Sequence, residues 1–343
     1  METNNRGMGM SRGIVIVFQV LLLGITSCAV MPKKWPEVVW PSSPEKPRIK
    51  FIASYKYVED LGESKWNRFV TKLTGRNPRV LFRKPYGVAV TNDGIIYVTD
   101  TIGSIVIIDP KKHRPGVFMP ETVSLRTPVG IAYDNMTSTL FVSDVTLNRV
   151  FGFDKKGKTI WELGAEEKFE NPAGIFFDEN DRRLYVVDSQ LHKVFVHDGA
   201  GKGLFEIGRR GVENGEFNFP ANVWTDRDSI YVVDTMNFRV QIFDKKGGFK
   251  KSIGKLGDVP GSFARPKGIA LDNYGHIYVV DAAFANFQIF DRKGNLLLFI
   301  GGNGEAPGQF ILPAGIFIDR LDRIYVVDQL NTRVQEFQYS GGK

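Results

Sequence analysis

The sequence has 343 residues, of which 43% are apolar and 24% charged, and its formal net charge is +7. These proportions are typical of a globular protein and argue against a disordered chain. With only one cysteine, Cys28, the chain can form neither an intrachain disulfide nor a cysteine metal cluster. The 36 glycines, 26 phenylalanines and 11 tyrosines favour strands joined by many turns.

Residues 1–27 are predicted to be a secretory signal. Arg6 and Arg12 precede an apolar run at residues 14–25, and about 12 residues are too few to span a bilayer. The three residues before Cys28, Ile25-Thr26-Ser27, resemble a bacterial lipobox. The resemblance implies lipidation of the Cys28 thiol, cleavage before this residue, and stable anchoring of an exported protein to the cell envelope.

The residue that follows Cys28 bears on the choice of membrane. In Gram-negative lipoproteins an aspartate at this place favours the inner membrane, whereas this chain has Ala29. The resemblance therefore implies the outer membrane rather than the inner one. The alternative is an ordinary signal peptide in which the cysteine is a coincidence.

Residues 28–47 are predicted to be a tether between the anchor and the folded domain. Proline at high density favours an extended, semi-rigid spacer. The prolines of this segment are Pro32, Pro36, Pro41, Pro44 and Pro47.

Residues 63–76 form the one helix-like stretch that we predict after the signal. Trp66, Phe69, Val70 and Leu73 follow helical spacing and would form an apolar stripe. Basic residues, Lys72 among them, line the rest of the surface. We weigh two interpretations, a helix packed on the domain and a contact with a membrane surface or a partner.

A repeated unit fills the remainder of the chain, and we take it as the main evidence for the fold. It begins with Pro-x-Gly in five of its six copies and contains about four short strand-like runs separated by turn residues. Four strands every 40–50 residues are typical of a propeller blade. The sequence therefore predicts an all-β, six-bladed β-propeller over residues 48–343. The copies begin at Pro85, Pro128, Pro172, Pro220, Pro266 and Pro313.

The sixth copy ends one strand short, and an unassigned strand-like run lies before the first copy. This run, residues 48–57, resembles the fourth strands of the other copies. We expect it to be the outer strand of the last blade, which would close the ring through backbone hydrogen bonds.

The segments Tyr231–Val240 (YVVDTMNFRV) and Tyr325–Val334 (YVVDQLNTRV) carry a motif that resembles the NHL repeat family. The likeness covers residues 48–340 and implies a six-bladed propeller. NHL propellers include RNA-binding modules, protein-binding modules and an amidating lyase, so the resemblance leaves the function open.

An aspartate ends the second strand of every copy. A residue repeated in each blade serves the blade, and we expect these carboxylates to accept hydrogen bonds from backbone N–H groups of the next turn. In that interpretation Arg149, Arg239 and Arg333 form charge-assisted pairs nearby. The six aspartates are Asp100, Asp144, Asp188, Asp234, Asp281 and Asp328.

The innermost runs are poor in groups that bind metals. Among them, only Tyr133, Asn222 and Thr225 carry side-chain oxygens, and none of these runs contains an acidic residue. A calcium site needs several converging oxygens. We therefore expect no metal, no cofactor and no catalytic residue.

The loops between the second and third strands are predicted to share one rim of the propeller. Exposed apolar residues on one rim would mark a partner site, and the alternative is that they pack inward. The candidate rim residues are Leu147, Leu191, Phe238, Phe284, Leu330, Arg149, Lys193, Arg239 and Arg333.

Taken together, these features predict a lipid-anchored, exported and monomeric propeller that is a scaffold for a protein or peptide. One alternative is a lactonase-like or lyase-like enzyme with a divalent metal at the channel mouth, and another is polyanion binding. Export argues against a nucleic-acid partner, as do basic residues that are scattered rather than clustered with aromatic ones.

Overall fold

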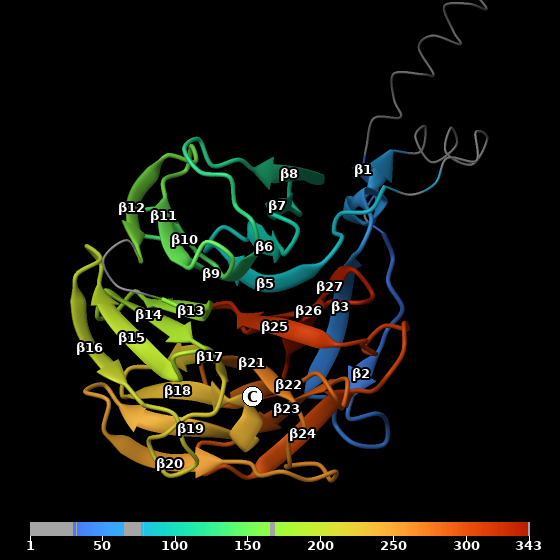
Figure 1. Cartoon of the computed structure of the whole chain (residues 1–343). Coiled ribbons are helices and arrows are strands. Elements are labelled where there is room, and N and C mark those ends of the chain that lie inside the picture. Colours follow the sequence, from blue (N-terminus) through green and yellow to red (C-terminus); the bar gives the residue numbers. More distant parts are fainter. Residues whose placement is uncertain (1–29, 32, 65–76, 78, 165–168, 342–343) are drawn as a thin grey trace, which may run out of the picture.

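The computed structural model describes residues 30–31, 33–64, 77, 79–164 and 169–341, which form a ring of β-sheets around an axis (Figure 1). Five sheets have four antiparallel strands, in chain order from the axis outward, and the sheet of the last blade has five. The predicted all-β, six-bladed propeller is confirmed. In the described part of the chain, no helix has both the length and the apolar character that a membrane span requires.

The strands of each blade run from the axis outward. Blade one contains β5 (Pro85–Val90), β6 (Ile96–Asp100), β7 (Ser104–Asp109) and β8 (Arg114–Phe118). Blade two contains β9 (Pro128–Asp134), β10 (Thr139–Asp144), β11 (Arg149–Phe153) and β12 (Thr159–Leu163). Blade three contains β13 (Pro172–Asp178), β14 (Arg183–Asp188), β15 (Lys193–Asp198) and β16 (Gly203–Ile207). Blade four contains β17 (Pro220–Thr225), β18 (Ser229–Asp234), the 3-10 turn η2 (Thr235–Asn237), β19 (Arg239–Asp244) and β20 (Phe249–Ile253). Blade five contains β21 (Pro266–Leu271), β22 (Ile277–Asp281), β23 (Asn286–Phe290) and β24 (Leu296–Gly301). Blade six contains β25 (Pro313–Ile318), β26 (Arg323–Asp328), β27 (Arg333–Tyr339), β3 (Ile49–Tyr55) and β2 (Val39–Trp40).

The burial of a strand depends on its place in the blade. The second strand β18 is buried at every residue, because a neighbouring blade covers each face of its sheet. The outermost strand β12 alternates between half-buried and exposed residues. This explains why Tyr-Val-Val-Asp is almost wholly apolar, whereas the fourth strands carry charged residues.

The apolar core is divided into six clusters, each between two neighbouring blades. One cluster joins Ala89 and Ile105 of blade one to Ile131 and Leu140 of blade two, for example. Another joins Tyr278 and Phe287 of blade five to blade six. Since no single cluster serves the whole domain, the ring needs all six interfaces.

Strand β3 closes the ring, as predicted. It pairs antiparallel with β27, from Val334 opposite Tyr55 to Tyr339 opposite Ile49. Phe51 is 2% exposed, and its ring contacts that of Phe337 edge-to-face at 5.7 Å. The two ends of the described chain are therefore joined in one sheet, where β3 lies beside β27 (Figure 1).

Part of the segment that we predicted to be a semi-rigid tether packs on the propeller. Strand β2 pairs with β3, and the Trp40 ring lies 5.8 Å from that of Phe337. Trp35 packs against Phe51 at 5.9 Å. Two tryptophans that sequence reasoning placed in a spacer instead bury apolar surface against blade six.

The predicted helix at residues 63–76 is wrong at its start. Glu63 and Ser64 form β4, which pairs with β1 (Val30–Met31). The preceding residues Val58–Leu61 form the 3-10 turn η1. The rest of the predicted helix, with Trp66, Phe69, Leu73 and Lys72, lies outside the described residues.

Loss of the Phe51 side chain tests the closure. We expect Phe51→Ala to lower the free energy of unfolding by about 3–5 kcal/mol, because a buried ring is lost from the closing strand. The matched control is Ile52→Ala on the same strand, since Ile52 is 37% exposed and points away from that core. Urea unfolding followed by circular dichroism measures both changes, and equal losses would contradict the closure.

Candidate functional site

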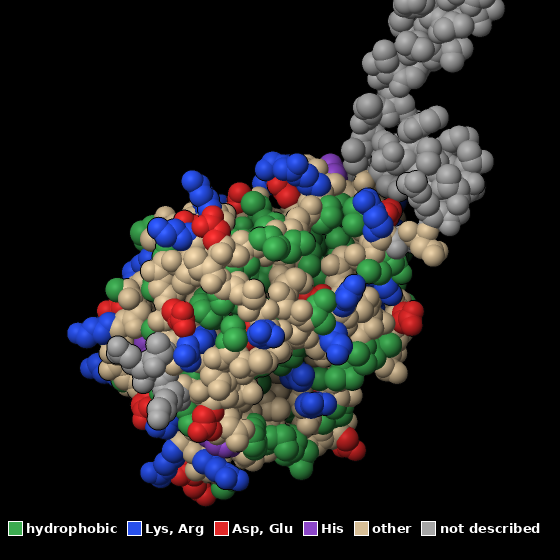
Figure 2. Space-filling view, turned by 45° about the horizontal axis from the view of Figure 1, so that its top comes forward, with side chains coloured by type: hydrophobic (Ala, Val, Ile, Leu, Met, Phe, Trp, Pro, Cys, Tyr) green, Lys and Arg blue, Asp and Glu red, His purple; other side chains and the backbone are tan. Residues whose placement is uncertain are grey.

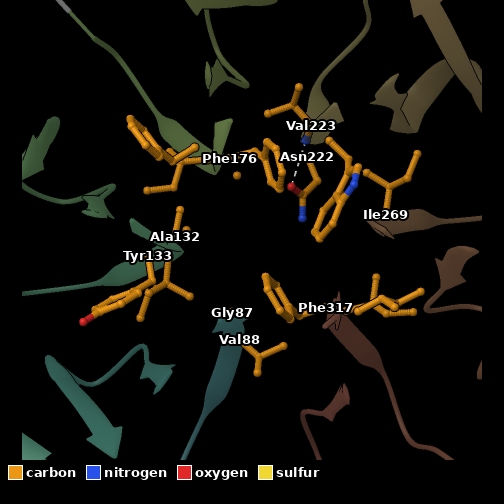
Figure 3. Close-up of a pocket in the computed structure, with 18 of the residues that line it drawn as sticks. Gly87, Val88, Ala132, Tyr133, Phe176, Asn222, Val223, Ile269 and Phe317 are labelled. Carbon is orange, nitrogen blue, oxygen red and sulfur yellow. Dashed lines mark hydrogen bonds between the residues drawn. The ribbon is translucent and has the colours of Figure 1, made fainter. Parts of the chain in front are cut away.

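The axial channel is lined by the first strands of the six blades, β5, β9, β13, β17, β21 and β25 (Figure 3). It encloses a cavity of about 240 Å³. We call its two ends the rim mouth and the turn mouth. The rim mouth lies where the first strands begin, beside the loops between second and third strands, and the turn mouth lies where the first strands end.

Glycine in the repeated Pro-x-Gly sets the width of the ring. A Cβ on Gly174 would lie 2.6 Å from the carbonyl oxygen of Ala221 in the next blade. A Cβ on Gly315 would lie 2.5 Å from the carbonyl oxygen of Tyr86. Only glycine therefore allows the neighbouring first strands to approach this closely.

Blade four departs from this pattern, because Asn222 stands where the other five blades have glycine. Its amide oxygen accepts a hydrogen bond from the Val223 N–H at 2.8 Å. Its amide nitrogen is directed toward the middle of the cavity (Figure 3). The exception brings a side-chain hydrogen-bond donor into the part of the channel beside the aromatic residues.

Two residues further along the first strands, aromatic side chains fill one side of the channel. The ring of Trp224 lies 4.3 Å from that of Phe176 and 5.5 Å from that of Phe317. Phe176 and Phe317 point toward the centre of the cavity (Figure 3). The equivalent residues of the other three blades are Ala89, Ala132 and Ala270. Of these alanines, Ala132 lines the cavity, together with Val88, Ile131 and Ile269.

A basic side chain, that of Lys267, lines the channel at the rim mouth. Lys267 lies with its Nζ 5.1 Å from the centre of the Tyr86 ring, which is a cation–π distance. Burial, and next the charge of Arg265, lower the pKa of Lys267 to about 8. Burial raises the pKa of Tyr86. The remaining residues of this ring are small and apolar: Val129, Ala173, Ala221 and Ala314.

At the turn mouth, hydrogen bonds join residues of neighbouring blades. Arg320 donates to the Asn92 carbonyl at 3.2 Å, and the Asn92 N–H donates to the Asn135 side chain at 2.7 Å. Asn135 in turn donates to Glu179 at 2.8 Å. These polar groups satisfy one another, so they link four blades rather than offer a vacant site.

Carboxylates near the turn mouth are engaged as well. Asp178 pairs with Lys245 at 2.5 Å, and Asp319 pairs with Arg323 at 2.7 Å. Among the described residues, no group of three or more histidine, cysteine, aspartate or glutamate side chains could hold a metal ion.

The six strand-ending aspartates join consecutive blades. Asp281 is fully buried and accepts four backbone N–H bonds: two from Ala264 and Arg265, in the loop before β21, and two from Ala283 and Phe284, in the turn after β22. Asp144 and Asp188 have the same kind of partners. Each carboxylate thus holds its own turn and the loop that enters its blade.

Three of these aspartates differ in detail. Asp100 accepts N–H bonds from Arg83 and Lys84. Asp234 and Asp328 also bind an arginine, Arg239 at 2.9 Å and Arg333 at 2.7 Å. Both arginines donate to backbone carbonyls of the preceding loop as well, so they stabilise the rim and are largely occupied there.

The other candidate rim residues lie in mixed environments. Leu330 is 60% exposed, whereas Leu147, Leu191, Phe238 and Phe284 are half-buried. Leu147 and Phe238 pack against core clusters. Two basic side chains of the rim form ion pairs with outer strands, Arg149 with Glu162 and Lys193 with Glu206. Cys28, the predicted lipidation site, lies outside the described residues.

The chain matches a family model described as "6-bladed beta-propeller" in three overlapping segments, residues 170–236, 220–288 and 273–343. Together they span residues 170–343, just over half of the chain. The chain belongs to this six-bladed β-propeller family, DUF5128.

Relatives of this propeller have varied roles. Protein brain tumor of Drosophila melanogaster is 39% identical over 62 residues, which are 18% of this chain and 6% of that protein. A gluconolactonase from Xanthomonas campestris has a TM-score of 0.61 at 13% identity, covering 91% of this chain and 100% of its own. An auxiliary nutrient binding protein from Bacteroides thetaiotaomicron has a TM-score of 0.60 at 15% identity, covering 75% and 69%. At these identities the solved structures support the fold alone.

Sequence reasoning missed most of the channel site. It named Asn222 and Tyr133 only as possible metal ligands, and in the structure the Tyr133 ring stacks on that of Tyr97 at 5.7 Å. Comparison of the six copies could have found the aromatic side, because Trp224 occupies a position that is alanine in three blades.

Replacement of a buried aspartate tests its structural role in this propeller. We expect Asp281→Ala to lower the free energy of unfolding by about 3–5 kcal/mol, because four buried N–H groups lose their acceptor. Asp291→Ala is the control, since Asp291 also accepts N–H bonds, from Lys293 and Asn295, but in a half-exposed turn. We expect this control to lose much less, because water can satisfy the N–H groups that it exposes. Thermal and urea unfolding measure both variants. If Asp281→Ala and Asp291→Ala lost similar amounts of stability, burial of the carboxylate would be unimportant.

Proposed function

We propose that the protein is an exported, lipid-anchored propeller that binds a protein or peptide partner at the cell envelope, through the rim mouth of its axial channel. The observation that carries this proposal is the channel itself. Its cavity of about 240 Å³ combines an aromatic side with polar side chains, among them Asn222 and Lys267. Apolar cavities with a few convergent polar groups are the usual form of a ligand site.

The surroundings of the rim mouth fit a partner that approaches from that side. Apart from Tyr86 and Lys267, the residues that ring this end are small, so they leave access to the aromatic cluster. Exposed apolar side chains lie on the adjoining loops, including Leu330, Met236 and Phe219, which are 60%, 49% and 41% exposed. The partner would cover these side chains and insert one group into the channel.

The two alternatives have less support in the described residues. The carboxylates near the channel are held by Lys245 and Arg323, which does not favour an enzyme that depends on a divalent metal. On the face visible in Figure 2, lysine and arginine side chains lie at many separate places with carboxylates among them. This distribution does not favour a polyanion site.

The position of the site can be tested by photo-crosslinking in the native envelope. A benzophenone amino acid would replace Ala221 at the rim mouth, Leu330 on the rim or Ile160 on an outer strand. We expect discrete adducts from positions 221 and 330 and none from position 160. Adducts at position 330 alone would place the partner on the rim and not in the channel. The absence of adducts at both would contradict the binding function.

The anchor is tested separately, at Cys28. We expect Cys28→Ala to abolish incorporation of a labelled fatty acid and to move the protein from the membrane pellet into the soluble fraction, because the acylated thiol is lost. The unmodified chain is the reference for both measurements. Continued sedimentation of the variant with membranes would show that another contact holds the protein there.

A further inference from the structure

The charge of Lys267 is the feature of the channel that the proposed binding function does not yet explain. Several other basic side chains of the propeller have carboxylate partners: Arg182 with Asp134, Lys245 with Asp178, Arg239 with Asp234 and Arg333 with Asp328. For Lys267, the structure of the described residues shows the Tyr86 ring at 5.1 Å and no ion pair. An ammonium group without a counterion at the mouth of an apolar cavity favours an anionic ligand.

Neighbouring groups strengthen this preference. Arg265 adds a second positive charge close to Lys267, and it acts on the pKa of Lys267 in the same direction as burial. The Asn222 amide nitrogen, on the strand of the preceding blade, is directed into the same cavity (Figure 3). A cation and a neutral donor together match the two oxygens of a carboxylate.

The other residues of the cavity favour an aromatic ring as the apolar part of the ligand. Trp224, Phe176 and Phe317 present ring surfaces. Aliphatic side chains, among them Val88 and Ala132, also line the cavity. An apolar cavity of about 150 Å³ is large enough to hold benzene. The volume of about 240 Å³ therefore accommodates one aromatic ring with a short substituent, and the three aromatic side chains give it favourable contacts.

We propose that the channel binds an aromatic carboxylate, with the carboxylate at Lys267 and Asn222 and the ring against Trp224, Phe176 and Phe317. This inference rests on the proposed binding function and specifies its ligand. The same chemistry has two sources, the carboxyl terminus of a peptide that ends in an aromatic residue and a free arylalkanoic acid.

Matched ligands separate the charge from the ring. Isothermal titration calorimetry on the mature propeller with Cys28→Ser would compare 3-phenylpropionate with 3-phenylpropionamide. It would also compare the peptide Gly-Gly-Phe with its C-terminal amide. We expect each acid to bind about tenfold or more tightly than its amide, which is the size of a charge-assisted hydrogen bond. The tighter of the two acids identifies the source.

Variants assign the preference to Lys267. Lys267→Met keeps the apolar stem of the side chain and removes the charge, so we expect it to lose the preference for acid over amide while still binding both. Arg265→Met, at the exposed neighbouring cation, should retain most of the preference. Trp224→Ala should weaken acid and amide alike, because the ring contact is lost.

The preference should also fall as the pH rises from 7 to 9. Lys267 is charged below its pKa of about 8 and loses its proton above it, so acid binding weakens while amide binding is unchanged. The raised pKa of Tyr86 keeps this side chain neutral in the same range.

The outcomes distinguish this inference from the proposed function. Equal binding of acid and amide to the unmodified channel, or a full preference in Lys267→Met, would overturn the carboxylate site and leave the binding function standing. No binding of any of the four ligands would also overturn the inference. In that case, adducts at position 221 in the crosslinking experiment would still support a channel partner, and the absence of adducts at both 221 and 330 would contradict both proposals.

Discussion

The pairing of β3 with β27 is the constraint on which the rest of the structure depends. The apolar core consists of six interfaces between neighbouring blades, and blade six can cover both of its neighbours only when its outer strand is present. Phe51 and Tyr55 enter two different interfaces from this one strand. Tyr55 also donates a hydrogen bond to the buried Glu336 at 2.6 Å. The pairing of β3 with β27 therefore closes the ring of six blades, and the closed ring determines the width of the channel.

Inside the ring, glycine and aspartate have complementary roles. Glycine at the third position of the blade lets adjacent first strands approach. A Cβ on Gly268, for example, would lie only 2.5 Å from the carbonyl oxygen of Ala314. The strand-ending aspartates tie each blade to its incoming loop through buried N–H bonds. Both residue types are repeated because every blade has the same geometric need. A repeated carboxylate in a propeller is thus explained by backbone hydrogen bonding before any chemistry is invoked.

The sequence predicts the repeat far better than the site. Regular spacing of Pro-x-Gly and Tyr-Val-Val-Asp indicates six blades, and the missing last strand indicates the closure at Ile49–Tyr55. It could not indicate that Trp35 and Trp40 pack on blade six, because proline-rich composition suggests a spacer and the packing surface comes from distant strands. Nor could it place Lys267 beside Tyr86, since 181 positions separate them and only the closed ring brings them together.

The position of the aromatic cluster shows how a symmetric ring acquires an asymmetric site. Residues required for close approach or for turn geometry cannot vary, so they are alike in nearly all blades. The second and fifth positions of the first strand are not constrained in this way, and they carry Lys267, Tyr86 and Trp224 in single blades. Asn222 is the one exception at the glycine position, and its side chain enters the cavity beside the aromatic cluster. Departures from the repeat therefore gather around one cavity, which is the arrangement expected if that cavity, rather than the repeated rim, determines what the propeller binds.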